Sequence, residues 1–129
     1  MKTLIALSIA VFPIAAHAQW SMPACSAERM YFEYQVQRRA RWVADTSLAV
    51  QPLSGVRDPA ALVQFVVDTT GVPVLRTFEV LVNDSALVGE VRRSLSRWRY
   101  VPAKVGDCLV SQLVQTAIGR KGAAGSRSR

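Results

Sequence analysis

Histidine and cysteine are scarce in this chain, and their scarcity excludes several kinds of chemistry. The 129 residues include one histidine, His17, and two cysteines, Cys25 and Cys108. Since His17 falls in a segment that we expect to be removed, the mature chain has no triad or acid–base pair built on histidine. Two thiols without histidine do not complete the usual tetrahedral zinc shell. We therefore expect no metal site and no cofactor.

A long apolar run occurs at the N-terminus, and it has the pattern of a secretory signal peptide. Lys2 supplies the positive charge, "LIALSIAVFPIAA" is the apolar region, and Ala16 and Ala18 mark a cleavage point after Ala18. The apolar region has 13 residues and contains Pro13, whereas a helix that crosses a bilayer needs roughly 20. The sequence predicts cleavage after Ala18 and a periplasmic protein. The alternative is an uncleaved inner-membrane anchor.

Export bears on the two cysteines. In an oxidising compartment, two cysteines favour a disulfide, here between Cys25 and Cys108. Closing a loop of this length would stabilise the fold by roughly 4 kcal/mol, less any strain. Two buried free thiols are the alternative.

Acidic residues are few beside the basic ones. Without Lys2 the chain keeps fifteen basic and nine acidic residues, a net charge of +6. Most of the arginines are dispersed, which favours a solvated surface over a binding patch. Asp68, Glu79 and Glu90 follow no motif that would pair them for catalysis. We expect a protein that is not an enzyme.

Alternation of apolar and polar residues locates the strands. "YFEYQVQ" at 31–37 has a period of two and predicts a strand. Residues 38–59 contain two prolines and a glycine, so we expect a connecting loop. "ALVQFVVD" at 61–68 and "VLRTFEVLV" at 74–82 predict two strands of a hairpin, joined through a turn at Gly71.

An amphipathic helix is predicted after the hairpin, over residues 85–99. Asp84 and its neighbours are good N-cap residues, and a stripe of apolar side chains follows at helical spacing. The stripe consists of Leu87, Val91, Leu95 and Trp98. Pro102 ends the helix, because it disfavours helical geometry in the preceding residue. "CLVSQLVQTAI" at 108–118 predicts the last strand, and 119–129 is expected to be a disordered basic tail.

These elements predict an α+β fold: a small antiparallel sheet of three to four strands with one helix packed on one face. The core order is strand, strand, helix, strand, and the helical crossover places the last strand beside the first strand of the hairpin, in the spatial order 2-1-3. The last strand then forms an edge with unpaired backbone groups. The strand at 31–37 would cover an edge that the sequence does not specify. The predicted division is a signal peptide at 1–18, an N-terminal segment at 19–59, a domain at 60–118 and a tail at 119–129.

The order of motifs between residues 60 and 118 resembles the C-terminal domain of TonB-family energy transducers. That family combines a strand ending in Val-Asp, a glycine turn, a helix ending in an aromatic-basic-aromatic run, x-Pro-Ala, and a second glycine turn before the final strand. The matching residues here are Val67, Asp68, Gly71, Trp98, Arg99, Tyr100, Pro102, Ala103 and Gly106. The usual anchor helix and proline-rich spacer of the family have no counterpart in this sequence.

The resemblance implies a binding module that captures an extended peptide of an outer-membrane transporter or another envelope protein by strand addition. It places the receiving edge in the last strand: Leu109, Val110, Ser111, Gln112, Leu113, Val114, Gln115 and Thr116. An inner-membrane energising complex would then act through another, anchored protein. We expect no nucleic acid as a partner, and exposed edges leave a homodimer open.

Two further predictions concern the residues at the end of the helix. Trp98 lies on the apolar stripe, so we expect it to pin the helix to the sheet rather than to contact a partner. Arg92, Arg93, Arg97 and Arg99 follow toward the helix C-terminus. The alternative function is therefore a periplasmic protein that binds polyanions or the envelope surface through this basic helix and the tail, with a steep salt dependence.

Overall fold

The computed structural model describes residues 29–122. The predicted signal peptide and Cys25 lie outside the described residues. Within this range no helix has the length and apolar character that a membrane crossing requires. The elements, in chain order, are β1 (Met30–Tyr31), a 3₁₀ helix (Glu33–Gln35), β2 (Arg41–Trp42), β3 (Val50–Leu53), β4 (Leu62–Val67), β5 (Pro73–Val82), α1 (Ser85–Ser94), a second 3₁₀ helix (Leu95–Arg97), β6 (Tyr100–Val101), β7 (Ala103–Val105) and β8 (Cys108–Arg120).

The predicted hairpin, crossover helix and last strand are confirmed. β4 pairs antiparallel with β5 on one side and with β8 on the other, so the spatial order is β5, β4, β8, as predicted. Asp84 is the N-cap of α1, and its carboxylate accepts hydrogen bonds from the backbone N–H groups of Ala86 and Leu87. The α-helix is shorter than predicted, because the chain tightens into the second 3₁₀ helix before Trp98 takes an extended conformation.

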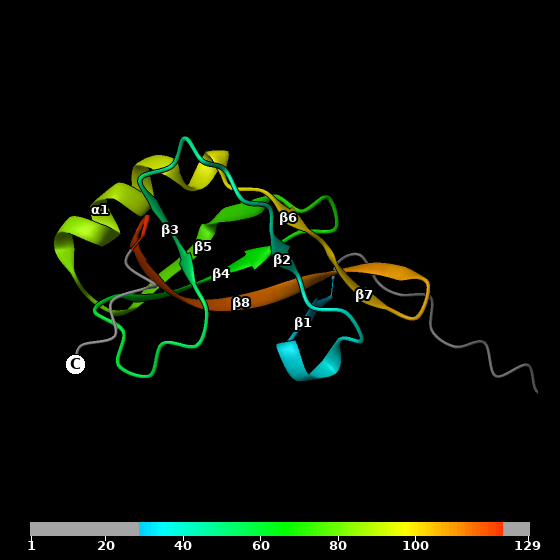
Figure 1. The fold of residues 1–129 in the computed structure, drawn as a ribbon. Helices are drawn as coiled ribbons and strands as arrows, with labels where there is room; N and C mark the ends of the chain where they lie inside the picture. The colour runs from blue at the N-terminus through cyan, green and yellow to red at the C-terminus, as the bar shows by residue number, and fades with distance from the viewer. Residues whose placement is uncertain (1–28, 123–129) are drawn as a thin grey trace, which may run out of the picture.

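The prediction of a small sheet is wrong: the sheet has six strands and is curled (Figure 1). β8 is 13 residues long, and its far side, away from β4, receives strands from the N-terminal segment. β3 pairs antiparallel with the C-terminal part of β8, and β1 pairs parallel with its middle. β8 is therefore a central strand where β1 and β3 pair with it, and the prediction that it forms an open edge is wrong at these residues.

The N-terminal segment also differs from the prediction in its local structure. The expected strand at 31–37 is reduced to β1 and the first 3₁₀ helix, because the Gln35 side chain accepts a hydrogen bond from the Phe32 backbone N–H and closes a turn. The Phe32 and Tyr34 rings stack on each other in exposed positions rather than in the core. The expected loop at 38–59 contains β2 and β3.

Trp98 is a core residue, as predicted, with no exposed surface. Its ring lies 6.1 Å from that of Phe65 and 6.3 Å from that of Trp42, measured between centroids. Its indole Nε1–H donates to the Ser94 hydroxyl at 3.2 Å. The helix end is thus fixed against both β4 and β2, and the junction after it is architectural.

The chain after Trp98 is held by the turn between β4 and β5. The Tyr100 backbone N–H donates to the Gly71 carbonyl oxygen at 2.8 Å. Gly71 has a φ of 83°, and an added Cβ would overlap the Tyr100 carbonyl oxygen. Only glycine combines this backbone conformation with so close an approach. The turn therefore places β6, and with it the Tyr100 side chain.

Candidate functional site

The predicted receiving edge, Leu109–Thr116, falls into three parts in the structure. Leu109 and Val110 pair with β7 across a tight turn. Ser111 and Gln112 pair with β1, and Gln112 also lies opposite β4. The remaining four residues, 113–116, pair with β4 on one side, and none of the described strands pairs with them on the other.

The open stretch at 113–116 is a gap between β1 and β3, the two described strands that pair with β8 on this side. β1 ends opposite Gln112, and β3 begins its pairing at Ala117. Four residues of an antiparallel strand extend over roughly 13 Å. We call this gap the β8 notch.

The backbone groups that face the β8 notch can be identified from the alternation of an antiparallel ladder. The Ile118 N–H donates to the Ala61 carbonyl oxygen, on the β4 side. Even-numbered residues of β8 therefore direct their N–H and C=O groups toward β4. Leu113 and Gln115 direct theirs into the notch, where the one contact from the described part of the chain runs from Gln112 Nε2 to the Leu113 carbonyl oxygen at 3.5 Å.

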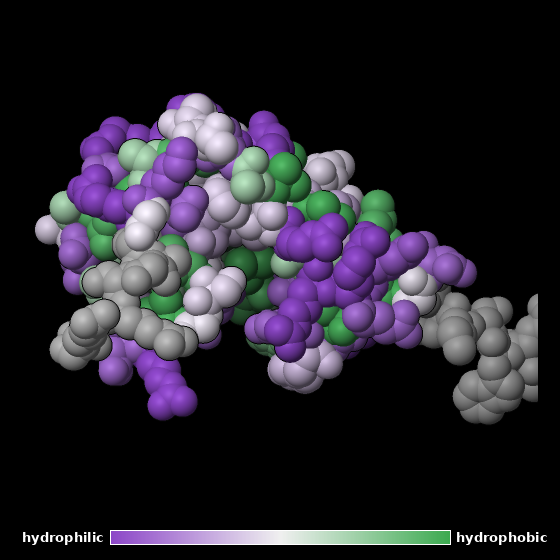
Figure 2. Space-filling model, in the orientation of Figure 1, coloured by the Kyte–Doolittle hydropathy of each residue, from purple (hydrophilic) through white to green (hydrophobic). Residues whose placement is uncertain are grey.

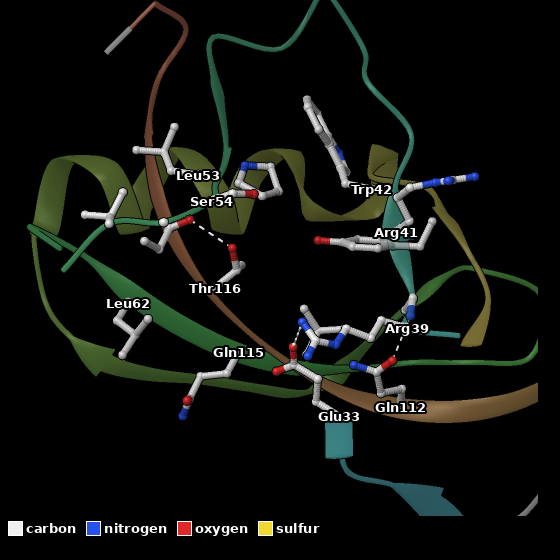
Figure 3. Close-up of a pocket in the computed structure, with 17 residues that line it drawn as sticks. Glu33, Arg39, Arg41, Trp42, Leu53, Ser54, Leu62, Gln112, Gln115 and Thr116 are labelled. Atoms are coloured by element: carbon white, nitrogen blue, oxygen red, sulfur yellow. Dashed lines mark hydrogen bonds and ion pairs between the residues drawn. The ribbon is translucent and has the colours of Figure 1, made fainter. Parts of the chain in front are cut away.

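A cleft of about 470 Å³ lies beside the notch. Its lining comes from β8, β2, β3 and the residues just after β3, from the first 3₁₀ helix and the segment before β2, and from one residue each of β4 and β6. It includes Gln112, Val114, Gln115, Thr116, Trp42, Tyr100, Leu53, Arg39, Arg41 and Glu33. Figure 2 shows the corresponding hollow near the middle of this face, with an apolar floor and a hydrophilic wall on one side. In Figure 3, Gln112 and Thr116 from β8 and Trp42 from β2 surround the same opening.

Three side chains at this cleft have buried and poorly satisfied polar atoms. Neither Trp42 Nε1 nor the Tyr100 hydroxyl has a hydrogen-bond partner among the described residues. Gln112 is 3% exposed; its Oε1 accepts from the Ala40 N–H at 2.7 Å, while its Nε2 makes only the long contact with Leu113 among residues 29–122. Burial raises the pKa of the Tyr100 hydroxyl above its ordinary value, so this group stays a protonated donor.

The charges at the cleft largely cancel. Arg39 forms an ion pair with Glu33 at 2.7 Å, and both side chains are more than half exposed (Figure 3). Arg41, also exposed, is the other basic residue of the lining. The cleft therefore offers hydrogen-bond donors more than net charge.

β5 forms the opposite edge of the sheet. None of the described strands pairs with its outer side, and Leu75, Leu81 and Val82 are exposed along it. Its ladder with β4 is irregular, with register shifts at two points. Thr77 takes part in one of them, since its hydroxyl accepts from the Val66 N–H and donates to the Val74 carbonyl oxygen.

The arginines of the basic helix are mostly engaged within the protein. Arg92 lies over the Phe78 ring, 4.9 Å from its centroid. Arg97 donates to the Ser47 hydroxyl, and Arg99 donates to the Ser96 and Trp98 carbonyl oxygens. Arg120, at the end of β8, pairs with Glu90 at 2.9 Å. These contacts spread the arginines over several directions.

The other predicted site features have separate outcomes. Cys108 is half-buried at the start of β8; because Cys25 lies outside the described residues, the disulfide stays a prediction. The Asp68 carboxylate holds the turn between β4 and β5 by accepting hydrogen bonds from Thr70 and Val72. Burial acts to raise its pKa, but hydrogen bonds from the Thr70 hydroxyl and the backbone N–H groups of Val72 and Thr70 outweigh it, so the pKa of Asp68 is lowered. Within 29–122, no cluster of three or more metal-ligating side chains is found.

Sequence reasoning missed the cleft residues Trp42 and Tyr100. They are partners in the β2–β6 ladder, a pairing between segments almost sixty positions apart in the sequence. Comparison of the chain with protein families, curated proteins and solved structures finds no match. The resemblance to TonB-family domains therefore rests on the motifs in the sequence.

Proposed function

We propose that this chain is an exported, TonB-like binding module that captures an extended peptide by strand addition at the β8 notch. The peptide would belong to an outer-membrane transporter or another envelope protein, and the module would contribute to energy-coupled transport through a separately anchored protein. The observation that carries the proposal is the four-residue open stretch of β8 beside a cleft of about 470 Å³.

The chemistry of the notch suits main-chain recognition. Leu113 and Gln115 offer two N–H donors and two carbonyl acceptors along one line. An added strand would satisfy these groups without a side-chain motif, which is how β-augmentation gives affinity. Side chains at alternate positions of the peptide would meet the cleft walls and give specificity.

The flanking strands limit the length of the peptide. A segment of about four residues fits between β1 and β3. A longer segment has to displace one of these two strands. β1 should be displaced more easily, since two residue pairs hold it to β8, whereas four residue pairs hold β3. We expect short segments to bind without rearrangement.

The test is a titration of the ¹⁵N-labelled chain with the capped tetrapeptide acetyl-Thr-Val-Thr-Val-amide, followed by backbone NMR. We expect shifts at Leu113 and Gln115 and at the facing ends of β1 and β3. Two N-methylated forms are the matched controls, one methylated at the first and third residues and one at the second and fourth. Strand addition predicts that one form loses binding and the other keeps it, because only one edge of the peptide faces β8.

The basic-helix alternative gives a different result in the same experiment. Shifts confined to residues 92–99 that disappear in moderate salt would overturn strand addition and favour a polyanion site. Main-chain pairing at the notch should change little with ionic strength.

A further inference from the structure

The cleft beside the β8 notch contains two buried donors whose positions are fixed by the fold. Trp42 and Tyr100 face each other across the β2–β6 ladder, so their side chains project from the same face and lie next to each other. Both line the cleft, and neither the Trp42 Nε1–H nor the Tyr100 hydroxyl has a partner among the described residues. Tyr100 is only 6% exposed.

The neighbouring aromatic residues show that a donor without a hydrogen-bond partner is not common to all the rings of this cluster. Trp98 belongs to the same cluster, 6.3 Å from Trp42 between ring centroids, and its Nε1–H is satisfied by Ser94. The Phe65 ring packs against the Tyr100 ring at 5.9 Å and has no polar group. The unsatisfied donors are the two that line the cleft, while the third points into the protein and is paired.

A buried donor without an acceptor is costly, so these two atoms call for an acceptor that enters from the cleft. We infer that the cleft contains a subsite for one neutral carbonyl oxygen of the bound peptide, held by the Tyr100 hydroxyl and the Trp42 indole N–H. The inference rests on the proposed function, and it adds the chemistry of one peptide group to it.

The charged residues of the cleft lining explain why the bound group should be a neutral carbonyl rather than a carboxylate. A buried carboxylate needs a cation to offset its desolvation. Arg39 is already paired with Glu33 at 2.7 Å, and Arg41 is exposed. An amide carbonyl accepts hydrogen bonds without this cost. The poorly satisfied Gln112 Nε2 is a further donor beside the same opening.

The subsite is tested with small probes and an indole signal. The chain has three tryptophans, and the Trp42 indole N–H resonance is assigned by its loss in Trp42→Phe. N-methylacetamide provides a neutral carbonyl and acetate a carboxylate of similar size. We expect the Trp42 indole proton to shift in a saturable manner with N-methylacetamide and with acetyl-Thr-Val-Thr-Val-amide. Acetate should give no saturable shift.

A variant separates the hydroxyl from the ring. Tyr100→Phe keeps the packing against Phe65, so its melting temperature should equal or exceed that of the parent, and it should weaken tetrapeptide binding by about fivefold or more. Tyr34→Phe is the matched control, because Tyr34 is 82% exposed and lies outside the cleft lining. We expect no change in affinity for this variant.

The outcomes distinguish this subsite from the proposed function. If the tetrapeptide shifts the Leu113 and Gln115 amides while the Trp42 indole and the affinity of Tyr100→Phe stay unchanged, the subsite is wrong and strand addition stands. If N-methylacetamide shifts the Trp42 indole and the tetrapeptide leaves Leu113 and Gln115 unmoved, strand addition at the notch is wrong. A saturable response to acetate stronger than that to N-methylacetamide overturns the neutral subsite. Linear, non-saturable shifts with both probes overturn it as well, since a trapped water would then account for the two donors.

Discussion

The two edges of the sheet, the outer side of β5 and the far side of β8, differ in more than the number of residues that no described strand pairs with. β5 is open along its whole outer side within the described residues, yet its ladder carries two register shifts and its side chains include Arg76 and Glu79. On its far side β8 pairs with β1 at residues 111–112 and with β3 at 117–120, which leaves 113–116 open between them, and its ladder with β4 runs without a shift. Bulges and charged residues are devices that prevent strands from adding to an edge.

The comparison favours the shorter opening as the site of the strand addition that we propose. At the β8 notch the exposed backbone lies beside a cleft with unsatisfied donors. At the β5 edge the exposed side chains are apolar or charged, and the irregular ladder disturbs the spacing that a new strand would need. A protected long edge and an unprotected short one are what a protein needs if it must bind a peptide without pairing with its own copies.

Loss of the Trp98 ring should have the largest effect on stability, because this buried ring packs against Phe65 and against Trp42, which lines the cleft beside the β8 notch. Trp98→Ala should lower the free energy of unfolding by roughly 3–5 kcal/mol, the range for a buried large aromatic side chain. Leu75→Ala on the open β5 edge is the control, at 54% exposure, and should change it by less than about 0.5 kcal/mol. Chemical denaturation measures both. A near-parental value for Trp98→Ala would mean that the aromatic cluster does not hold the cleft together.

The turn at Gly71 should come next, because it fixes the strand that carries Tyr100. Gly71→Ala introduces a Cβ at a φ of 83° and against the Tyr100 carbonyl oxygen. Gly106→Ala is the matched control, since its φ is also positive but the added Cβ meets nothing within 4 Å. The control should lose about 1–2 kcal/mol of stability for the left-handed conformation, and Gly71→Ala should lose more. Equal losses of stability for the two variants in thermal unfolding would show that the close approach of Gly71 to the Tyr100 carbonyl oxygen does not contribute to stability.

A direct contrast of the two edges comes from one substitution in each. Gln115→Pro removes a backbone donor that faces the β8 notch, and it should weaken binding of acetyl-Thr-Val-Thr-Val-amide by about tenfold or more, whereas Gln115→Ala should not. Leu81→Lys adds a charge to the β5 edge and should leave the affinity unchanged. Isothermal titration calorimetry gives the affinities, after circular dichroism has shown that each variant is folded. Weaker binding by Leu81→Lys alone would move the site to β5.

The smallest expected effect concerns the pH dependence of the turn between β4 and β5. The pKa of Asp68 is lowered in the folded protein, so its favourable contribution is complete above its unfolded pKa of about 3.9 and is lost as the pH falls through the folded value. Asp68→Asn should therefore cost about 1 kcal/mol at neutral pH, and the difference from the parent should shrink in acid. A difference that grows below pH 4 in urea unfolding would contradict this sign.

Much of the fold follows from periodicity in the sequence. The hairpin, the N-cap at Asp84 and the antiparallel placement of β8 beside β4 were all predictable, because each depends on a local pattern or a short connection. β3 was not, because Pro52 suggests a loop. In the structure Pro52 lies opposite Ile118, whose N–H is directed to Ala61 on the other side, so the ladder needs no donor from Pro52.

The candidate site was predictable only in part. The last strand was identified from its apolar run, but the shape of its opening depends on where β1 and β3 stop, and that depends on long-range pairing. The pairing of Trp42 with Tyr100 carries no local signal either. Their roles become visible only when burial and hydrogen-bond partners are known.

Amide hydrogen exchange tests most directly whether the β8 notch is open and receives a strand. In the free protein, the Leu113 and Gln115 amides should exchange faster than those of Val114 and Thr116, which are directed to β4. Saturating acetyl-Thr-Val-Thr-Val-amide should slow Leu113 and Gln115 and leave the amides of β5 unchanged. Equal protection along 113–116 in the free protein, or new protection on β5 when the peptide is added, would contradict strand addition at the notch.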